Sequence, residues 1–567
     1  GKGKGRKGGR NRVLVCGAGP VGLRAACEAA LLGFHVEVIE KRPNFSRANI
    51  LTFWDETMSD LLALGAKSYF PNCQFTGEQK ALGTRQIQLC FLKTLLLLGG
   101  SVRYGHEVCG VVHDEDPQSS WAAVVKPYVK QDVAASAGPC AAEGDTAAAA
   151  EVTEFQKAKT YADAHADASG QETCDVDWSF VRRKSSGARE DVDTNCQHLL
   201  LPFDFYLIAE GGWSFSTSKL GFSKNVEFFK PAFGLVINAQ YDPSDLKERE
   251  MRSRVAFCLS GEWPLKQCPI MADFVEYLKG ETHFIALSVA KTNPLYEPEL
   301  AKAGAKDIRA AIDAKEGKYG KGGSCDDPGE GPKLSSATAK YLAKLTPAER
   351  AQVPQSVIDQ MNFSATMQGL HEMGVFREAF NSGRDCLAPS NVDVEKLHAT
   401  ARQIMYDLGL PASVPFHPTN SVQLFDFSRR ARCVDSARVL HADDDGQALQ
   451  VFSPQEYEAH RAGTGPALGS EALVLPVGDS LQEPNWTQGL GINRGFHTAL
   501  NQVYACLIAR ESGDFANGVQ ESRVAQDAVL KMRWGMGNSG LAGSGSGAVG
   551  IKPFAKWTCE PRTRLPM

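Results

Sequence analysis

The sequence predicts an α/β fold in which a Rossmann-like nucleotide-binding domain is interleaved with a second domain built on a mixed sheet. Three observations support this prediction. The apolar run 13–16 leads into a glycine-rich turn, an Ala-rich helix over 23–32 and a second strand over 35–40. A third apolar strand covers 205–209. A fourth covers 472–477 and ends in Gly-Asp near the far end of the chain.

The first glycine-rich turn has the spacing of a dinucleotide-binding loop. Gly17 permits the tight turn, Gly19 lets the backbone approach a pyrophosphate, and Gly22 lets helix and strand pack closely. The helix that follows presents unpaired N–H groups and the positive end of its dipole. Glu40 ends the second strand, where an acid binds both hydroxyls of an adenosine ribose. The acid favours FAD or NAD over NADP at this site, and a glycine turn without a nucleotide is the alternative.

The far end of the chain favours FAD over NAD. Asp479 follows the strand over 472–477, and a Gly-Asp pair there can hydrogen-bond a ribityl chain. Gly489, Gly491 and Asn493 then open a helix whose N-terminus can receive the flavin pyrimidine carbonyl. Two nucleotide motifs at opposite ends of the chain, meeting on one cofactor, predict a flavoprotein.

A third motif lies between these two. The strand over 205–209 runs into Glu210 and Gly211, which resemble the Asp-Gly motif of aromatic-ring hydroxylases with Glu in place of Asp. In that family the motif lies between the flavin and NAD(P)H. A simple strand-to-loop turn is the alternative, and the order of the three motifs argues against it.

The chain resembles the flavin monooxygenase domain of the MICAL proteins. The resemblance is carried by GAGPVGLRAACEAALLG, VEVIEKRPNFSRANIL, TRQIQLCFLKTLLLLG and GDSLQEPNWTQGLGINRGFHTAL, and it covers roughly 12–115, 197–300 and 360–512. It implies a p-hydroxybenzoate-hydroxylase-type fold binding FAD, with NADPH as reductant and O2 as oxidant. In MICALs the target is methionine on actin filaments. Ala48 stands where the family has His, which weakens the actin assignment.

The resemblance also implies roles for individual residues. Arg47 and Asn49 match residues lining the isoalloxazine pocket, with a loop salt bridge as the alternative for Arg47. Trp486 matches an aromatic bordering the active site, although a packing role is the ordinary one for such a Trp. The expected FAD contacts further include Arg42 and Arg85, the latter with a solvated helix-start residue as its alternative.

Composition excludes several other classes of protein. The 567 residues carry a net charge of −5, so nucleic acid is not an expected partner. No run of 18 apolar residues predicts a membrane span, and no secretory signal is visible. The 15 cysteines form no Cys-x-x-Cys pair, which favours a reducing, cytoplasmic location. The 12 histidines lack metal-ligand spacing, so no metal site is expected.

The motifs divide the chain into segments. The FAD-binding domain is expected in three pieces, over 12–114, 197–222 and 471–512. A substrate domain covers 223–470 and includes a Lys/Gly-rich loop at 302–335. The remaining segments are a basic disordered tail over 1–11, an Ala/acidic insertion over 115–196 and a C-terminal tail over 513–567.

These observations predict an FAD-dependent monooxygenase that uses NAD(P)H and O2, with actin or another methionine-bearing protein as substrate. A small-molecule hydroxylase or epoxidase, or an NADPH oxidase that releases peroxide, would use the same machinery. A flavin-bearing interaction module without turnover is a further alternative. His283, on an expected strand over 281–289, is interpreted as structural rather than as a catalytic base.

Overall fold

The computed structural model forms two compact units, which are described separately. Unit 1 comprises 1–132, 161–227 and 430–567, and unit 2 comprises 133–160 and 228–429. The structure describes residues 11–53, 55–66, 74–76, 79–114, 121–128, 171–184, 198–212, 214–228, 233–246, 248–249, 257–264, 270–279, 281–292, 370–371, 374–377, 387, 391–411, 413–418, 421–426, 429–443, 448–464, 470–484 and 491–531.

Unit 1 is built on a seven-stranded sheet in the order β21-β20-β22-β12-β1-β2-β6. Five strands run parallel, and β20 and β21 add an antiparallel edge. The bounds are β1 Arg12–Cys16, β2 His35–Glu40, β6 Ser101–Tyr104, β12 Phe205–Ile208, β20 Arg438–Ala442, β21 Leu449–Phe452 and β22 Ser470–Pro476. The central strands are apolar and buried on both faces, as parallel strands between helices must be. The predicted α/β class with a Rossmann-like sheet is confirmed.

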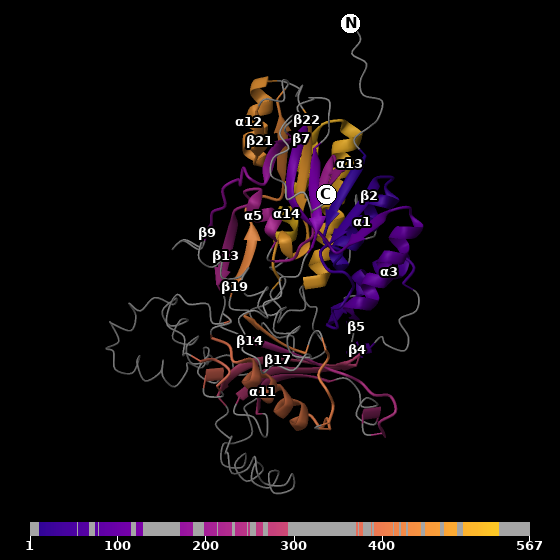
Figure 1. The fold of residues 1–567 in the computed structure, drawn as a ribbon, viewed down its shortest axis with the longest axis vertical. Helices are drawn as coiled ribbons and strands as arrows, with labels where there is room; N and C mark the ends of the chain where they lie inside the picture. The colour runs from indigo at the N-terminus through magenta and orange to yellow at the C-terminus, as the bar shows by residue number, and fades with distance from the viewer. Residues whose placement is uncertain are drawn as a thin grey trace, which may run out of the picture. The chain divides into compact units, whose positions relative to one another are not determined.

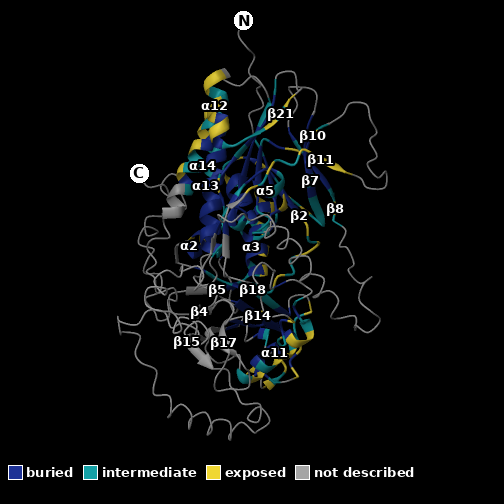
Figure 2. Cartoon of the chain, turned by 90° about the vertical axis from the view of Figure 1, so that its left-hand side faces the viewer, coloured by how far each residue is buried: buried dark blue, intermediate teal, exposed yellow. Residues whose placement is uncertain are grey.

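The helices of unit 1 pack on this sheet, on a smaller sheet or on one another (Figure 1). They are α1 Pro20–Leu31, α2 Asp55–Ala63, α3 Thr84–Leu97, α5 Phe215–Lys219, α12 Pro454–Thr464, α13 Gly491–Ser512 and α14 Phe515–Lys531. One core cluster joins sheet and helices, with Phe91 of α3 against Phe496 of α13 at a ring-centroid distance of 5.5 Å. Figure 2 shows α13 as largely buried. Its apolar residues point in all directions because the sheet, α1 and α14 all pack against it.

Three smaller sheets complete unit 1. Their orders are β10-β7-β8-β11, β19-β13-β9 and β3-β5-β4. The bounds are β3 Ile50–Phe53, β4 Gln74–Thr76, β5 Gln79–Gly83, β7 His106–Asp114, β8 Ala122–Pro127, β9 Gln171–Glu172, β10 Val181–Lys184, β11 Leu199–Pro202, β13 Lys224–Phe228 and β19 Arg429–Cys433. A second core cluster contains Trp121 and Phe180 together with Tyr206 of the large sheet.

Unit 2 is built on a five-stranded sheet in the order β15-β16-β17-β14-β18. Every pair in it is antiparallel, whereas the large sheet and the sheet β10-β7-β8-β11 of unit 1 mix parallel and antiparallel pairs. The bounds are β14 Phe233–Ala239, β15 Phe257–Pro264, β16 Ile270–Lys279, β17 His283–Thr292 and β18 Val422–Asp426. Helix α11, Val394–Asp407, begins where the Asp393 side chain accepts from the Lys396 N–H, and it packs on the buried face.

Several segments belong to other parts of the fold than the sequence analysis predicts. Within the expected insertion over 115–196, β8 and β10 pair with β7 of unit 1. Within the expected substrate domain, β20 pairs with β22 and so belongs to unit 1. The expected tail after 512 includes α14, which packs on α13. In each case the assignment follows from pairing or packing with another segment of unit 1. Residues 1–10 and the expected loop at 302–335 lie outside the described residues.

Candidate functional site

The glycine-rich turn after β1 has the backbone that the spacing predicts. Gly17 has a φ of +107°, and a Cβ there would collide with the Ala209 carbonyl oxygen. A Cβ on Gly22 would collide with the Gly17 carbonyl oxygen. Gly19 differs, because a Cβ there would meet nothing within 4 Å. The turn is therefore packed against the protein at Gly17 and Gly22 and open at Gly19, as a surface that receives a pyrophosphate must be.

Helix α1 begins at this open side. Gly19 is its N-cap residue, Pro20 occupies its first turn, and no side chain caps it. The N–H groups of its first turn therefore have no intrahelical partner. An anionic group placed beside Gly19 would meet these donors and the positive end of the helix dipole.

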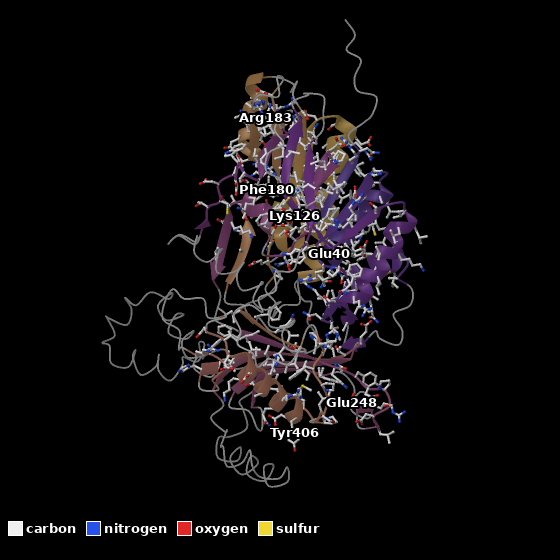
Figure 3. The ribbon with its side chains drawn as sticks, in the orientation of Figure 1. Glu40, Lys126, Phe180, Arg183, Glu248 and Tyr406 are labelled. Atoms are coloured by element: carbon white, nitrogen blue, oxygen red, sulfur yellow. The ribbon has the colours of Figure 1, made fainter. Side chains whose placement is uncertain are left out.

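Glu40 stands at the end of β2, beside the turn (Figure 3). Its Oε2 accepts from the Ala18 N–H at 2.7 Å, and its Oε1 accepts from the Arg42 N–H at 2.9 Å. The residue is 7% exposed. Each carboxylate oxygen has two lone pairs, so each keeps acceptor capacity for one hydroxyl of a ribose. A 2′-phosphate in the same position would be repelled.

The Gly-Asp pair lies in a short 3-10 helix, η3, over Gly478–Ser480. The Gly478 N–H donates to Thr498 Oγ1 of α13 at 2.8 Å, which fixes the strand end against that helix. Burial raises the pKa of Asp479 to about 6, with Glu483 adding to the rise and Arg47 opposing it. The charge of Arg47, from the other end of the sequence, therefore acts on the Asp479 carboxyl.

Asn493 and Gly491 lie at the start of α13. Asn493 is fully buried, and its Nδ2 donates to the Thr52 carbonyl oxygen of β3 at 3.0 Å. A Cβ on Gly491 would stand 3.2 Å from Pro484. The bond from Asn493 to Thr52 joins the first turn of α13 to the segment that follows Arg47 and Asn49. The expected residues Trp486 and Gly489 lie outside the described residues.

Glu210 has its carboxylate engaged within the protein. It accepts from the Cys16 thiol at 3.0 Å, the Ser214 hydroxyl at 2.8 Å, and the Ser216 N–H and hydroxyl at 2.8 and 2.7 Å. Burial and this carboxylate raise the pKa of Cys16 well above its usual range. Gly211 has a φ of +88°, and its carbonyl oxygen accepts from Ser480 Oγ at 3.0 Å. The Glu-Gly pair therefore packs beside the Gly-Asp pair, with the Glu side chain turned toward β1.

The remaining expected residues lie at the surface of the same unit. Arg42 is partly buried, and its carbonyl oxygen accepts from the Gly105 N–H at 3.2 Å. Arg47 is exposed, and Arg85 is exposed in the first turn of α3. The Asn49 carbonyl oxygen accepts from the N–H and the hydroxyl of Thr84, at 2.8 and 2.7 Å. Their contacts with a cofactor stay predictions.

Sequence reasoning missed Gln88, which is 5% exposed on α3. Its Nε2 donates to the Ala18 carbonyl oxygen at 2.8 Å, so it contacts the glycine-rich turn directly. The signal was a polar residue between the apolar residues Ile87 and Leu89. That signal identifies a buried amide but not its partner.

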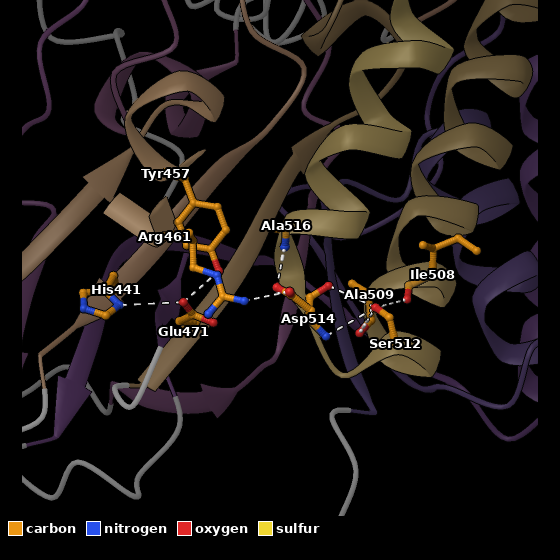
Figure 4. A network of polar contacts seen from close by, with 9 residues as sticks. All are labelled: His441, Tyr457, Arg461, Glu471, Ile508, Ala509, Ser512, Asp514 and Ala516. Atoms are coloured by element: carbon orange, nitrogen blue, oxygen red, sulfur yellow. Dashed lines mark hydrogen bonds and ion pairs between the residues drawn. The ribbon is translucent and has the colours of Figure 1, made fainter. Parts of the chain in front are cut away.

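Two further polar networks are formed by other residues of the chain. In Figure 4, Tyr457 donates to Glu471 at 2.8 Å and Arg461 pairs with Asp514 at 2.7 Å, which joins α12 to β22 and to the α13–α14 turn. In unit 2, buried His283 lies 2.8 Å from the Tyr277 hydroxyl and 3.3 Å from Glu248. These partners fit the structural interpretation of His283.

Two further features concern the described residues as a whole. No group of three His, Cys, Asp or Glu among them could hold a metal ion. None of their helices is both long and apolar enough to cross a membrane.

No protein-family model matches the chain. A curated relative, the F-actin monooxygenase MICAL1 of Rattus norvegicus, is 45% identical over 117 residues, which is 20% of this chain and 11% of the relative. MICAL1 of Homo sapiens is 44% identical over 117 residues, which is again 20% of this chain and 11% of the relative. MICAL3 of Mus musculus is 40% identical over 129 residues, which is 22% of this chain and 6% of the relative. The match spans about a tenth of these relatives' length or less. The resemblance to the MICAL flavin monooxygenases is confirmed over this segment.

Two solved structures align with most of the chain. The p-nitrophenol 4-monooxygenase PnpA of Pseudomonas putida has a TM-score of 0.42 at 10% identity, with 98% of this chain and 92% of that chain covered. A 2-methyl-3-hydroxypyridine-5-carboxylic acid oxygenase has a TM-score of 0.42 at 10% identity, with 98% of both chains covered.

Proposed function

We propose that this chain is an FAD-dependent monooxygenase that uses NADPH and O2 to oxidise a methionine thioether of a protein. One observation carries the proposal. The open turn at Gly19, the ribose acceptor Glu40 and the residues Arg47 and Asp479 lie in one unit, although they come from opposite ends of the chain. The similarity to the F-actin monooxygenases MICAL1 and MICAL3 supports it.

These residues suit the successive parts of FAD. Gly19 and the N-terminus of α1 would hold the pyrophosphate, and Glu40 the adenosine ribose. Asp479 would accept from the ribityl chain, and the start of α13 would lie beside the pyrimidine edge of the ring. FAD supplies hydride acceptance and oxygen activation. The side chains of this unit bind it, orient it and exclude water.

A thioether substrate fits the residues expected around the ring. The balanced reaction turns a thioether, O2, NADPH and a proton into a sulfoxide, NADP⁺ and water. Sulfur is already nucleophilic, so no side chain has to remove a proton from the substrate. A phenol hydroxylase needs a group that ionises the ring hydroxyl. Arg47, Asn49 and Trp486 include no such group, which favours methionine.

The site for the reductant is proposed beside Glu210 and Gly211. The described residues of unit 1 form one Rossmann-like sheet, and its nucleotide turn is assigned to FAD. NADPH would then bind in a shallow site next to the flavin. Because Glu210 already accepts four hydrogen bonds, we expect Gly211 and its backbone to make the closer approach.

The proposed location is the cytoplasm, where thiols stay reduced. The described cysteines are free thiols, and several of them are buried in the sheet and helices of unit 1. This observation fits a reducing compartment.

The decisive experiment compares NADPH consumption by the purified yellow protein with and without F-actin and a methionine-bearing peptide. Peroxide release and sulfoxide, found by mass spectrometry, are measured in parallel. We expect sulfoxide formation, and Trp486→Ala should impair oxidation more than FAD binding. Peroxide without sulfoxide would identify an oxidase, and efficient hydroxylation of a phenol would identify a small-molecule enzyme. Flavin that neither NADPH nor NADH reduces would identify an interaction module.

A further inference from the structure

The first two turns of α3 contact two cofactor segments that are far apart in the sequence. Thr84 and Gln88 lie four residues apart and therefore share a helix face. Thr84 is 3% exposed and Gln88 is 5% exposed. Thr84 donates a hydrogen bond to Asn49, and Gln88 donates one to the turn that contains Gly17 and Gly19.

Gln88 completes the fixation of the glycine-rich turn. Its Nε2 donates to the Ala18 carbonyl oxygen at 2.8 Å, while the Ala18 N–H donates to Glu40 at 2.7 Å. Ala18 is thus held from both sides, between the glycines that shape the pyrophosphate surface. Gly17, the preceding residue, has a φ of +107°. An unrestrained glycine adopts this conformation and many others. The two hydrogen bonds at Ala18 restrict the backbone of Gly17 to one of these conformations.

The buried amide of Gln88 fits this role rather than a packing role. Its Oε1 is buried and has no hydrogen-bond partner among the residues that the structure describes. An unsatisfied amide oxygen in the interior is unfavourable, so an apolar side chain of the same shape would pack better. What glutamine adds is the donor to Ala18.

Thr84 fixes the second segment in the same way. Its N–H and its hydroxyl both donate to the Asn49 carbonyl oxygen, at 2.8 and 2.7 Å. Asn49 stands between exposed Arg47 and strand β3. The start of α3 therefore sets where this segment leaves the surface and enters the sheet.

We infer that Thr84 and Gln88 are positioning residues for FAD, which hold the pyrophosphate turn and the Arg47–Asn49 segment in their binding conformations. The inference rests on the proposed function. Neither residue is assigned a contact with FAD. When a binding-competent conformation is only partly populated, the apparent Kd rises by the inverse of that fraction. Loss of these hydrogen bonds should therefore weaken FAD binding mainly by slowing association.

The test uses the full chain, stripped of flavin and titrated with FAD. Gln88→Met keeps the shape of the side chain and removes the donor, and Thr84→Val removes one hydroxyl. We expect an increase in Kd of about tenfold for Gln88→Met and about threefold for Thr84→Val. Once saturated, both should show the wild-type flavin absorption spectrum.

The matched control is Thr94→Val on the same helix. Thr94 Oγ1 donates to the Leu64 carbonyl oxygen at 3.1 Å, outside both cofactor segments. The Thr94→Val variant should lose stability as Thr84→Val does, while its Kd for FAD stays within about twofold of the wild-type value. An unchanged Kd in folded Gln88→Met, or an equal rise in Thr94→Val, overturns the inference.

Gln88→Glu serves if Gln88→Met does not fold. It keeps the size of the side chain but can donate only when protonated, so its FAD affinity relative to wild type should recover as the pH falls. No recovery would count against the inference. A wild-type protein that binds no FAD refutes the proposed function instead, before any variant is compared.

Discussion

At the scale of single residues, the glycines of the first turn have different roles. Gly17 and Gly22 are constrained by the protein itself, because a Cβ on either would strike backbone. A Cβ on Gly19 would have no neighbouring atom within 4 Å. A substitution at Gly17 or Gly22 should therefore damage the fold, whereas one at Gly19 should damage ligand binding alone.

Gly19→Asp tests this distinction. The added carboxylate would stand against the pyrophosphate, so we expect FAD affinity to fall about 100-fold or more, with little change in the melting temperature of the apoprotein. Fluorescence titration and differential scanning fluorimetry measure the two quantities. Gly463→Asp, in open space on α12, is the control and should keep its flavin. Tight FAD binding by Gly19→Asp would contradict the proposed pyrophosphate site.

Asp479 predicts a pH dependence of stability. Its pKa of about 6 lies above the usual value of 3.8. Between these values the folded protein binds more protons than the unfolded chain, so this group's contribution to the free energy of unfolding falls as pH rises through that window. Asp479→Asn should therefore raise the melting temperature of the apoprotein at pH 7 more than at pH 4.5. An equal effect at both pH values would show that this carboxyl titrates normally.

At the scale of elements, a buried ion cluster holds α2 against α1. Arg24 is 1% exposed and donates to both oxygens of Asp60, at 2.6 and 2.8 Å. Glu28, one turn further along α1, lies 2.9 Å from the same guanidinium. Asp60 is the link between the helices, since Arg24 and Glu28 share one helix.

Asp60→Ala should lower the free energy of unfolding by about 3–5 kcal/mol, because it leaves a buried guanidinium with half of its partners. Urea denaturation of the apoprotein measures this. The matched control is Glu458→Ala, which breaks the exposed pair with Arg523 and should cost less than about 1 kcal/mol. Similar losses in the two variants would mean that burial adds nothing to the Arg24 cluster.

At the scale of the whole molecule, the described residues assigned to FAD all lie in unit 1. Unit 2 has its own core, with Phe233, Leu397 and Val422 packed between sheet and helix. Ligand binding should therefore act first on the stability of unit 1.

Added FAD should raise the melting temperature of the transition that includes unit 1. At a free concentration 100 times the Kd, the gain is about 2.7 kcal/mol. Calorimetry of the apoprotein at increasing FAD concentrations measures it, with AMP as a control that lacks the flavin. A transition that FAD does not move would contradict a site in unit 1.

Features that depend on local physics could be predicted from the amino-acid sequence. The strand, turn and helix around Gly17–Gly22 and the acid at Glu40 could be predicted because glycine spacing and apolar runs act over a few residues. The run 472–477 and the helix after it were predicted for the same reason.

Strand pairing and side-chain contacts became evident only in the folded chain, because they depend on the positions of other segments. The strands of 122–127 and 181–184 exist because they pair with β7, and β20 joins unit 1 because it pairs with β22. Composition alone made the first two look like an insertion. Likewise, the direction of the Glu210 carboxylate and the bond from Gln88 to Ala18 depend on segments that meet only after folding. Apolar periodicity records that a residue is buried, but a hydrogen bond also requires its partner's position, which only the folded chain supplies.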